Sequence, residues 1–132
     1  MVDETHDSEL ADSIHVSAQV RFLNDQSSPE ARRYVFSYTI AIHNQGNTSA
    51  QLLTRQWLIT DADGRLQEVQ GEGVIGEQPH IAPGETHVYT SGAIIETPVG
   101  TMEGRYGMVS EAGEIFDAAI PVFRLAVPGV LN

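Results

Sequence analysis

The stretch "RYVFSYTIAIHN", from Arg33 to Asn44, decides the fold class. Bulky apolar residues occupy every second position from Tyr34 to Ile42. Successive side chains of a β-strand point to opposite faces of a sheet, so this period of two predicts a strand with one buried face. The same period runs through "IHVSAQVRF", from Ile14 to Phe22. The sequence therefore predicts two half-buried strands before its midpoint.

Further strands are predicted on the C-terminal side of this stretch. "QLLTRQWLIT", which contains Arg55, has apolar residues on both faces and is typical of a strand inside a sheet. Turn clusters such as "DADG", "IAPGE" and "EAGE" separate the later strands. Pro121 cannot donate to a strand ladder, which predicts an edge or a bulge. About seven strands without a helix predict an all-β, immunoglobulin-like or fibronectin-III-like antiparallel sandwich, with a small closed barrel as the alternative.

The length of 132 residues fits one domain. Residues 1–13 contain five acidic residues and no basic one, and they lack periodicity. We therefore expect a flexible acidic tail over 1–13 and a single domain over 14–132. The chain has no cysteine, which excludes disulfides and thiolate metal sites.

The formal net charge is −11, and all seven basic residues are arginine. Such a surface repels a phosphate backbone, so no nucleic-acid polymer is expected as a partner. No apolar run approaches the roughly 20 residues of a membrane helix, so no membrane partner is expected. The acidic N-terminus is unlike a secretory signal, which predicts a cytoplasmic protein.

A literal G-x-G-x-x-G pattern, "GEGVIG", is formed by Gly71, Gly73 and Gly76. A dinucleotide loop needs these glycines to leave a strand and open a helix, but here they lie between a strand and a turn. Glu72 and Glu77 would also repel a phosphate. The glycines are therefore interpreted as shaping a long loop, and an anion nest of backbone N–H groups is the alternative.

Metal and catalytic constellations are sparse. The five histidines form no i, i+2 or i, i+4 pair, so no metal site and no cofactor are predicted. The chain has neither a cysteine nucleophile nor a lysine, and Ser91 lacks the first glycine of a nucleophile elbow. Arg55 is interpreted as structural, with anion binding as the alternative. No catalytic residue is predicted.

Two glycine-containing loops are the expected exposed elements, Gly71–Gly84 and "SGAIIETPVG" from Ser91 to Gly100. Loops of this length in a compact domain are usually functional or pack over a sheet end. Ile94 and Ile95 stand outside a clear alternation and could form a partner surface.

Several blocks in this order resemble the ApaG (CorD) family: "RYVFSYTIAIHNQG", "RQWLIT", "EVQGEGVIGEQPHIAPGE", "YTSG", "TPVGTMEGRYGM" and "IPVFRLAVP". The resemblance runs from about Val16 to Pro128 and departs at His87, where an aromatic residue is expected. It implies an immunoglobulin-like or fibronectin-III-like sandwich in a cytoplasmic bacterial protein. It also implies an association with cobalt resistance and magnesium efflux, and no catalytic residues. Related domains in an F-box protein and a polymerase-delta-interacting protein imply protein binding.

Three functions are consistent with these residues. The first is a noncatalytic module that binds a protein partner of unknown identity through loops at one end of the sandwich. The second is a module that binds a nucleotide, pyrophosphate or divalent cation at the GEGVIG loop. The third is an enzyme acting on phosphoanhydrides, for which no assembled cationic set is visible. A homodimer through an edge strand stays open.

Overall fold

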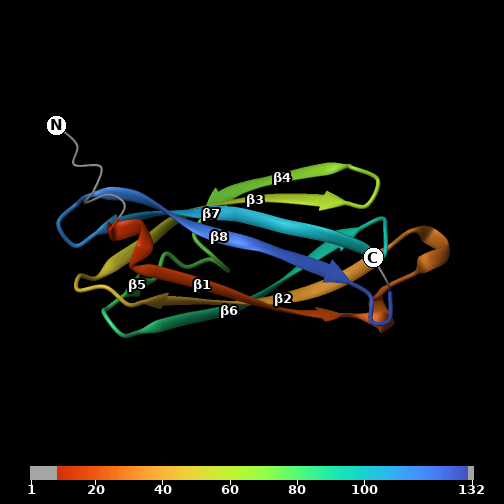
Figure 1. Ribbon diagram of the computed structural model, residues 1–132, viewed down its shortest axis with the longest axis horizontal. Coiled ribbons are helices and arrows are strands. Elements are labelled where there is room, and N and C mark those ends of the chain that lie inside the picture. The colour runs from red at the N-terminus through yellow and green to blue at the C-terminus, as the bar shows by residue number, and fades with distance from the viewer. Residues whose placement is uncertain (1–8, 131–132) are drawn as a thin grey trace.

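The computed structural model describes residues 9–130, which form two packed antiparallel β-sheets (Figure 1). The small sheet has the order β1-β2-β6, and the large sheet has the order β4-β3-β7-β8 with β5 paired to β3. The predicted sandwich is thus confirmed, and the closed barrel is wrong. The strand bounds are β1 Ile14–Phe22, β2 Tyr34–Asn44, β3 Ala50–Asp61, β4 Leu66–Glu72, β5 His80–Ile81, β6 Thr86–Ile95, β7 Val99–Ser110 and β8 Ile115–Ala126.

The core lies between the sheets and follows the period of two. Phe36, Ile40 and Ile42 of β2 are fully buried, and Met102 and Tyr106 of β7 meet them from the large sheet as members of the same core cluster. Two short 3-10 helices, η1 Asn24–Gln26 and η2 Pro29–Ala31, join β1 to β2. Among the described residues, no helix is long and apolar enough to cross a membrane.

The strand that contains Pro121 has both features that the proline predicts. β8 is an edge strand of the large sheet. Its register against β7 shifts between Met102, which faces Phe123, and Gly104, which faces Ile120. Two residues of β8 thus lie opposite one residue of β7, which is a β-bulge.

The expected flexible tail over 1–13 needs correction at its C-terminal end. Residues 9–12 form a helical turn, and the Leu10 side chain is only 6% exposed in the hydrophobic core. The Ser13 hydroxyl donates to the Leu10 carbonyl at 2.6 Å and closes the turn. One leucine among charged residues anchors this turn. The sequence therefore shows no apolar periodicity that would predict a helical turn here. Residues 1–8 lie outside the described residues.

The predicted loop from Ser91 to Gly100 is wrong, because β6 continues to Ile95. Ala93 and Ile95 are buried, whereas Ile94 points outward and is 44% exposed. Buried and exposed side chains still alternate along β6. The alternation is hard to see in the sequence, because the polar Ser91 points inward and the apolar Ile94 points outward. The connection to β7 is therefore reduced to residues 96–98.

Candidate functional site

The second half of the GEGVIG motif is a tight β-hairpin. The amide of Val74 donates to the Glu77 carbonyl at 2.8 Å, and the amide of Glu77 donates back to Val74 at 3.0 Å. The two residues between them, Ile75 and Gly76, have φ of +47° and +74°. Positive φ at both central positions defines a type I′ turn, the favoured two-residue hairpin connection. The predicted glycine-shaped loop is thus a hairpin without a helix.

Each of the three glycines meets a different steric demand. A Cβ at Gly71 would lie 2.7 Å from the guanidinium nitrogens of Arg55. A Cβ at Gly73 would lie 2.2 Å from the carbonyl oxygen of Glu77, and Gly73 also has φ of +64°. A Cβ at Gly76 would meet no atom within 4 Å, so glycine is favoured there only by the left-handed backbone conformation.

Arg55 of β3 fastens the start of this hairpin. Its Nη1 atom donates to the carbonyls of Glu72 at 2.9 Å and Gly73 at 3.0 Å. The arginine is half-buried and crosses over Gly71 to reach these oxygens. The structural interpretation of Arg55 is therefore the one that the contacts support.

These contacts limit what an anion could use at the hairpin. The Gly73 amide donates to the Leu53 carbonyl at 2.9 Å, and the Val74 amide is committed to Glu77. Within the described part of the chain, the amides of Ile75 and Gly76 have no backbone acceptor among the turn and loop hydrogen bonds. The hypothesis that Gly71, Gly73 and Gly76 form an anion nest stays a prediction, and these two amides are the donors that a titration would report.

The strand register brings two histidines together that their spacing in sequence does not. His15 of β1 lies directly opposite His43 of β2. The His43 Nδ1 atom is 2.8 Å from the Thr86 hydroxyl on β6. Among residues 9–130, no group of three or more histidine, aspartate or glutamate side chains is arranged to hold a metal ion.

A buried polar pair lies between the sheets near Arg55. The hydroxyl of Tyr89 on β6 is hydrogen-bonded to that of Tyr106 on β7. Burial raises the pKa of both hydroxyls well above the ordinary value, so both are neutral at physiological pH. Trp57 packs edge-on against Tyr106, and its buried Nε1 has no hydrogen-bond partner among residues 9–130.

An ionic network closes the opposite end of the molecule. Asp61 accepts hydrogen bonds from the amides of Asp63 and Arg65 and from the Arg65 guanidinium. Burial opposes ionisation of Asp61, but these donors outweigh it, so the pKa of Asp61 is lowered. Arg65 also pairs with Glu96 at 3.1 Å, and the Ala62 amide donates to Thr97. Residues 96–98 therefore lie at the β3–β4 turn, at the other end of β3 from the GEGVIG hairpin.

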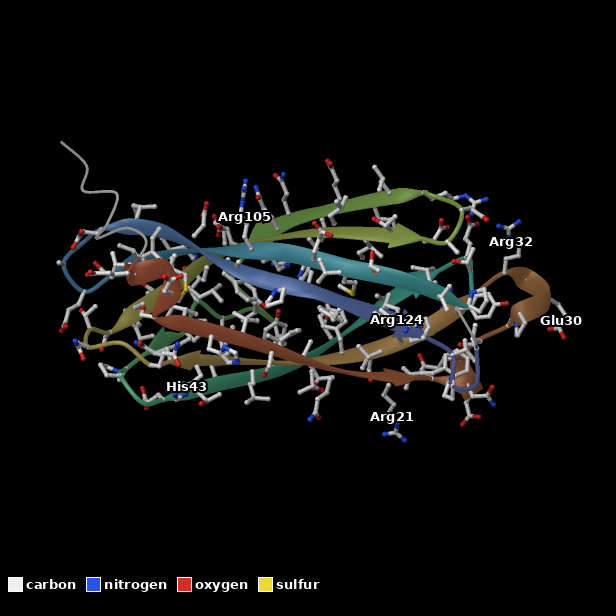
Figure 2. All side chains as sticks on the ribbon, in the orientation of Figure 1. Arg21, Glu30, Arg32, His43, Arg105 and Arg124 are labelled. Carbon is white, nitrogen blue, oxygen red and sulfur yellow. The ribbon has the colours of Figure 1, made fainter. Side chains whose placement is uncertain are left out.

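The small sheet is set apart by its charge. Its three strands contain no aspartate or glutamate, and their one arginine is Arg21. Its outer face consists mainly of small or uncharged side chains, for example Gln19, Thr39 and Thr90, which lie in register across the three strands. Figure 2 shows Arg21 and His43 on the small-sheet side of the sandwich, while Arg105 projects from the large sheet on the other side. Every acidic residue among 9–130 lies outside these strands.

A groove crosses the open edge of β6. It has a volume of about 470 Å³ and is lined by residues of strands β2, β3, β4 and β6 and of the segment between β1 and β2. The Gln67 side-chain amide of β4 donates to the Ile94 carbonyl of β6 at 3.1 Å, which shows that β4 lies alongside this edge. The lining residues are Gln26, Arg33, Val35, Ile59, Gln67, Val69, Gly92, Ala93 and Ile94.

A second hollow of about 560 Å³ lies on the outer face of the large sheet. Glu68 and Glu103 flank Leu58 there in one cross-strand row, and Gln56 and Arg105 occupy the next row. This hollow carries charged side chains of both signs, in contrast to the face of the small sheet.

Comparison with known proteins assigns the chain to a family. The family model of the ApaG domain matches residues 24–110. The chain belongs to the ApaG family. Protein ApaG of Pseudomonas paraeruginosa is 56% identical over 125 residues, which cover 95% of this chain and 99% of that relative. The ApaG model thus spans both the GEGVIG hairpin and the open edge of β6.

Solved structures show the same fold. An X-ray structure of a structural genomics target superposes with a TM-score of 0.88 at 54% sequence identity and covers 92% of each chain. A crystal structure described as an ApaA protein from Bordetella pertussis has a TM-score of 0.86 at 48% identity, over 89% of this chain and 95% of that one. The ApaG sandwich is therefore shared over nearly the whole chain.

Proposed function

We propose that this ApaG protein is a noncatalytic module that binds a protein partner through its small sheet. The observation that supports the proposal is the absence of acidic residues from β1, β2 and β6 in a chain with a net charge of −11. Charged residues are depleted at the centres of protein interfaces, because their desolvation is costly. A face with no acidic residue and a single arginine, Arg21, on a molecule with a net charge of −11 is the surface that a partner covers at least cost.

This proposal moves the binding surface away from the two loops. The GEGVIG hairpin and residues 96–98 lie at opposite ends of β3, so they form no common surface at one end of the sandwich. Ile95, one of the two isoleucines expected on that surface, is 1% exposed in the core. Ile94 keeps its place in the proposal, because it projects from β6 of the small sheet.

Capture from a bacterial lysate tests the proposal. The immobilised protein should retain one or more defined proteins, identified by mass spectrometry, and Thr90→Lys should abolish their retention. Gln56→Lys, which adds the same charge to the outer face of the large sheet, should retain them. Equal retention by the wild type and Thr90→Lys, or retention of nothing, would refute partner binding at the small sheet.

The proposal includes a cytoplasmic location and a part in cobalt resistance and magnesium efflux, both implied by the family resemblance. Complementation tests the second: a bacterium that lacks its own ApaG gene should regain cobalt tolerance with the wild type and fail to regain it with Thr90→Lys. Rescue by both proteins would separate the cation phenotype from the small sheet.

Binding of a small ligand at the GEGVIG hairpin is tested separately by titration with Mg²⁺, Co²⁺ or diadenosine polyphosphate. Amide shifts confined to residues 71–76 at millimolar ligand would favour the small-ligand function over protein binding.

A further inference from the structure

The edge strands of the sandwich differ in how they are protected. Natural edge strands carry charges, prolines or bulges that prevent pairing with another chain. β4 carries Glu68 and Glu72, β8 carries the Pro121 bulge, and β1 carries Arg21. β6 has ten residues, no charged side chain, no proline and no register shift against β2. It is the edge without any of these safeguards.

The hydrogen-bonding groups on this open edge follow from the register. The Asn44 amide donates to the Glu85 carbonyl, so these two residues form a hydrogen-bonded pair at the start of the β2–β6 ladder. Hydrogen-bonded pairs alternate along an antiparallel ladder, so the odd-numbered residues of β6 bond to β2. The N–H and C=O groups of Val88, Thr90, Gly92 and Ile94 therefore face away from β2. The bond from Gln67 to the Ile94 carbonyl agrees with this assignment.

The residues around the β6 edge favour a single extended peptide segment as the binding partner. Gln67 and Val69 of β4 line one side of the groove at Gly92–Ile94, and Gln26 and Arg33 also line it. β4 lies alongside this edge, and the groove of about 470 Å³ between them suits a single extended segment better than the edge of a second folded domain. Arg33 is the one charged residue in this lining, in a molecule with a net charge of −11. A carboxylate on the occupant would complement it.

We propose that β6 binds an extended peptide segment of a partner protein by strand addition. The segment pairs its backbone with the outward groups of Val88, Thr90, Gly92 and Ile94, as in other strand-addition complexes. The side chains on one face of the segment lie beside Ile94, those on the other face lie toward Val69 of β4, and an acidic residue reaches Arg33. Gln67 releases the Ile94 carbonyl as the segment enters. This inference rests on the proposed protein-binding function and specifies its partner chemistry.

A library of random linear dodecapeptides displayed on phage provides the probe. Peptides that bind the full chain are selected and counter-selected against Gly92→Pro. This variant removes one outward N–H, at a position where an edge strand tolerates proline. A selected peptide is then titrated into isotope-labelled wild-type protein, and amide hydrogen exchange is measured by NMR. We expect exchange of the Val88, Thr90 and Gly92 amides to slow by about tenfold or more, while the already bonded Tyr89 and Ser91 amides do not change.

Variants sharpen the test. Arg33→Ala should weaken an acid-containing peptide by about tenfold, and Gln56→Lys, on the outer face of the large sheet, should leave its affinity unchanged. If Gly92→Pro does not fold, the alternation of protected amides in the wild type still decides the question. Selection of no peptide, or protection without alternation, overturns strand addition. A concentration-dependent dimer that protects the same amides assigns the edge to a second copy and also overturns it. Lysate proteins lost from Thr90→Lys without alternating protection would leave the proposed function standing and refute strand addition alone.

Discussion

Gly71 and Arg55 lie directly opposite each other on β4 and β3, and the Arg55 guanidinium occupies the space of the side chain that Gly71 lacks. From this position it donates to the carbonyls of Glu72 and Gly73. The first glycine of the GEGVIG motif thus leaves space for the side chain of an arginine of the same molecule.

Gly71→Ala should displace Arg55 and lower the free energy of unfolding by about 1–2 kcal/mol, because charge-assisted hydrogen bonds are lost. Arg55→Ala should cost a similar amount. The double variant should cost little more than either one, since both changes remove the same contacts. Urea unfolding of the four proteins measures this cycle. Additive losses would show that Gly71 and Arg55 act independently.

Gly73→Ala should be the most damaging alanine substitution in the motif, at roughly 2 kcal/mol or more. The new Cβ would collide with the Glu77 carbonyl in addition to adopting a left-handed backbone. Gly76→Ala is the matched control, because it has the same sign of φ and no close neighbour. It should cost about 1 kcal/mol. Thermal unfolding compares the two, and equal losses would exclude a steric role for Gly73.

Ile75→Asn should stabilise the protein by about 1 kcal/mol. Ile75 is a β-branched residue with φ of +47°, and its side chain is 63% exposed, so it gains little from burial. Asparagine before glycine is the favoured pair for a type I′ turn. Ile115→Asn, at an equally exposed strand position, should lower the melting temperature instead. A lower melting temperature for Ile75→Asn would mean that the isoleucine makes a stabilising contact.

Stability should fall above about pH 10 because of Tyr89 and Tyr106. Burial raises the pKa of both in the folded state, while the unfolded hydroxyls ionise near 10.0. Below pH 10 both states bind the same protons, so this contribution is constant. Above pH 10 the unfolded state releases protons that the folded state keeps, and stability declines by about 1.4 kcal/mol per pH unit for each tyrosine. Urea unfolding between pH 8 and 11 should show a shallower decline for the double variant Tyr89→Phe/Tyr106→Phe. Parallel declines would exclude these residues as the cause.

The fold was predictable because most strands bury one face with a period of two, as β2 does from Phe36 to Ile42. The predictions failed where that polarity breaks. In β6 the polar Ser91 points inward and the apolar Ile94 points outward, so the sequence pattern of its second half predicts a loop. Leu10 anchors a helical turn with one side chain, and a single residue carries no period. β5 has two residues, too few to be recognised in the sequence.

The candidate site was less predictable, because its groups meet through register. His15 faces His43, and Arg55 faces Gly71, across ladders that sequence spacing does not reveal. The absence of acidic residues from β1, β2 and β6 could nevertheless be read from the amino-acid sequence. It becomes a property of one surface when the topology gathers these three strands into one sheet.

The confinement of acidic residues to positions outside the small sheet has a consequence for ionic strength. Salt weakens attraction between exposed charges, so encounters guided by these acidic residues slow as salt rises. An encounter on the small sheet depends on apolar contact and backbone hydrogen bonds. A partner held there should remain bound in concentrated salt that elutes basic proteins attracted to the remainder of the surface.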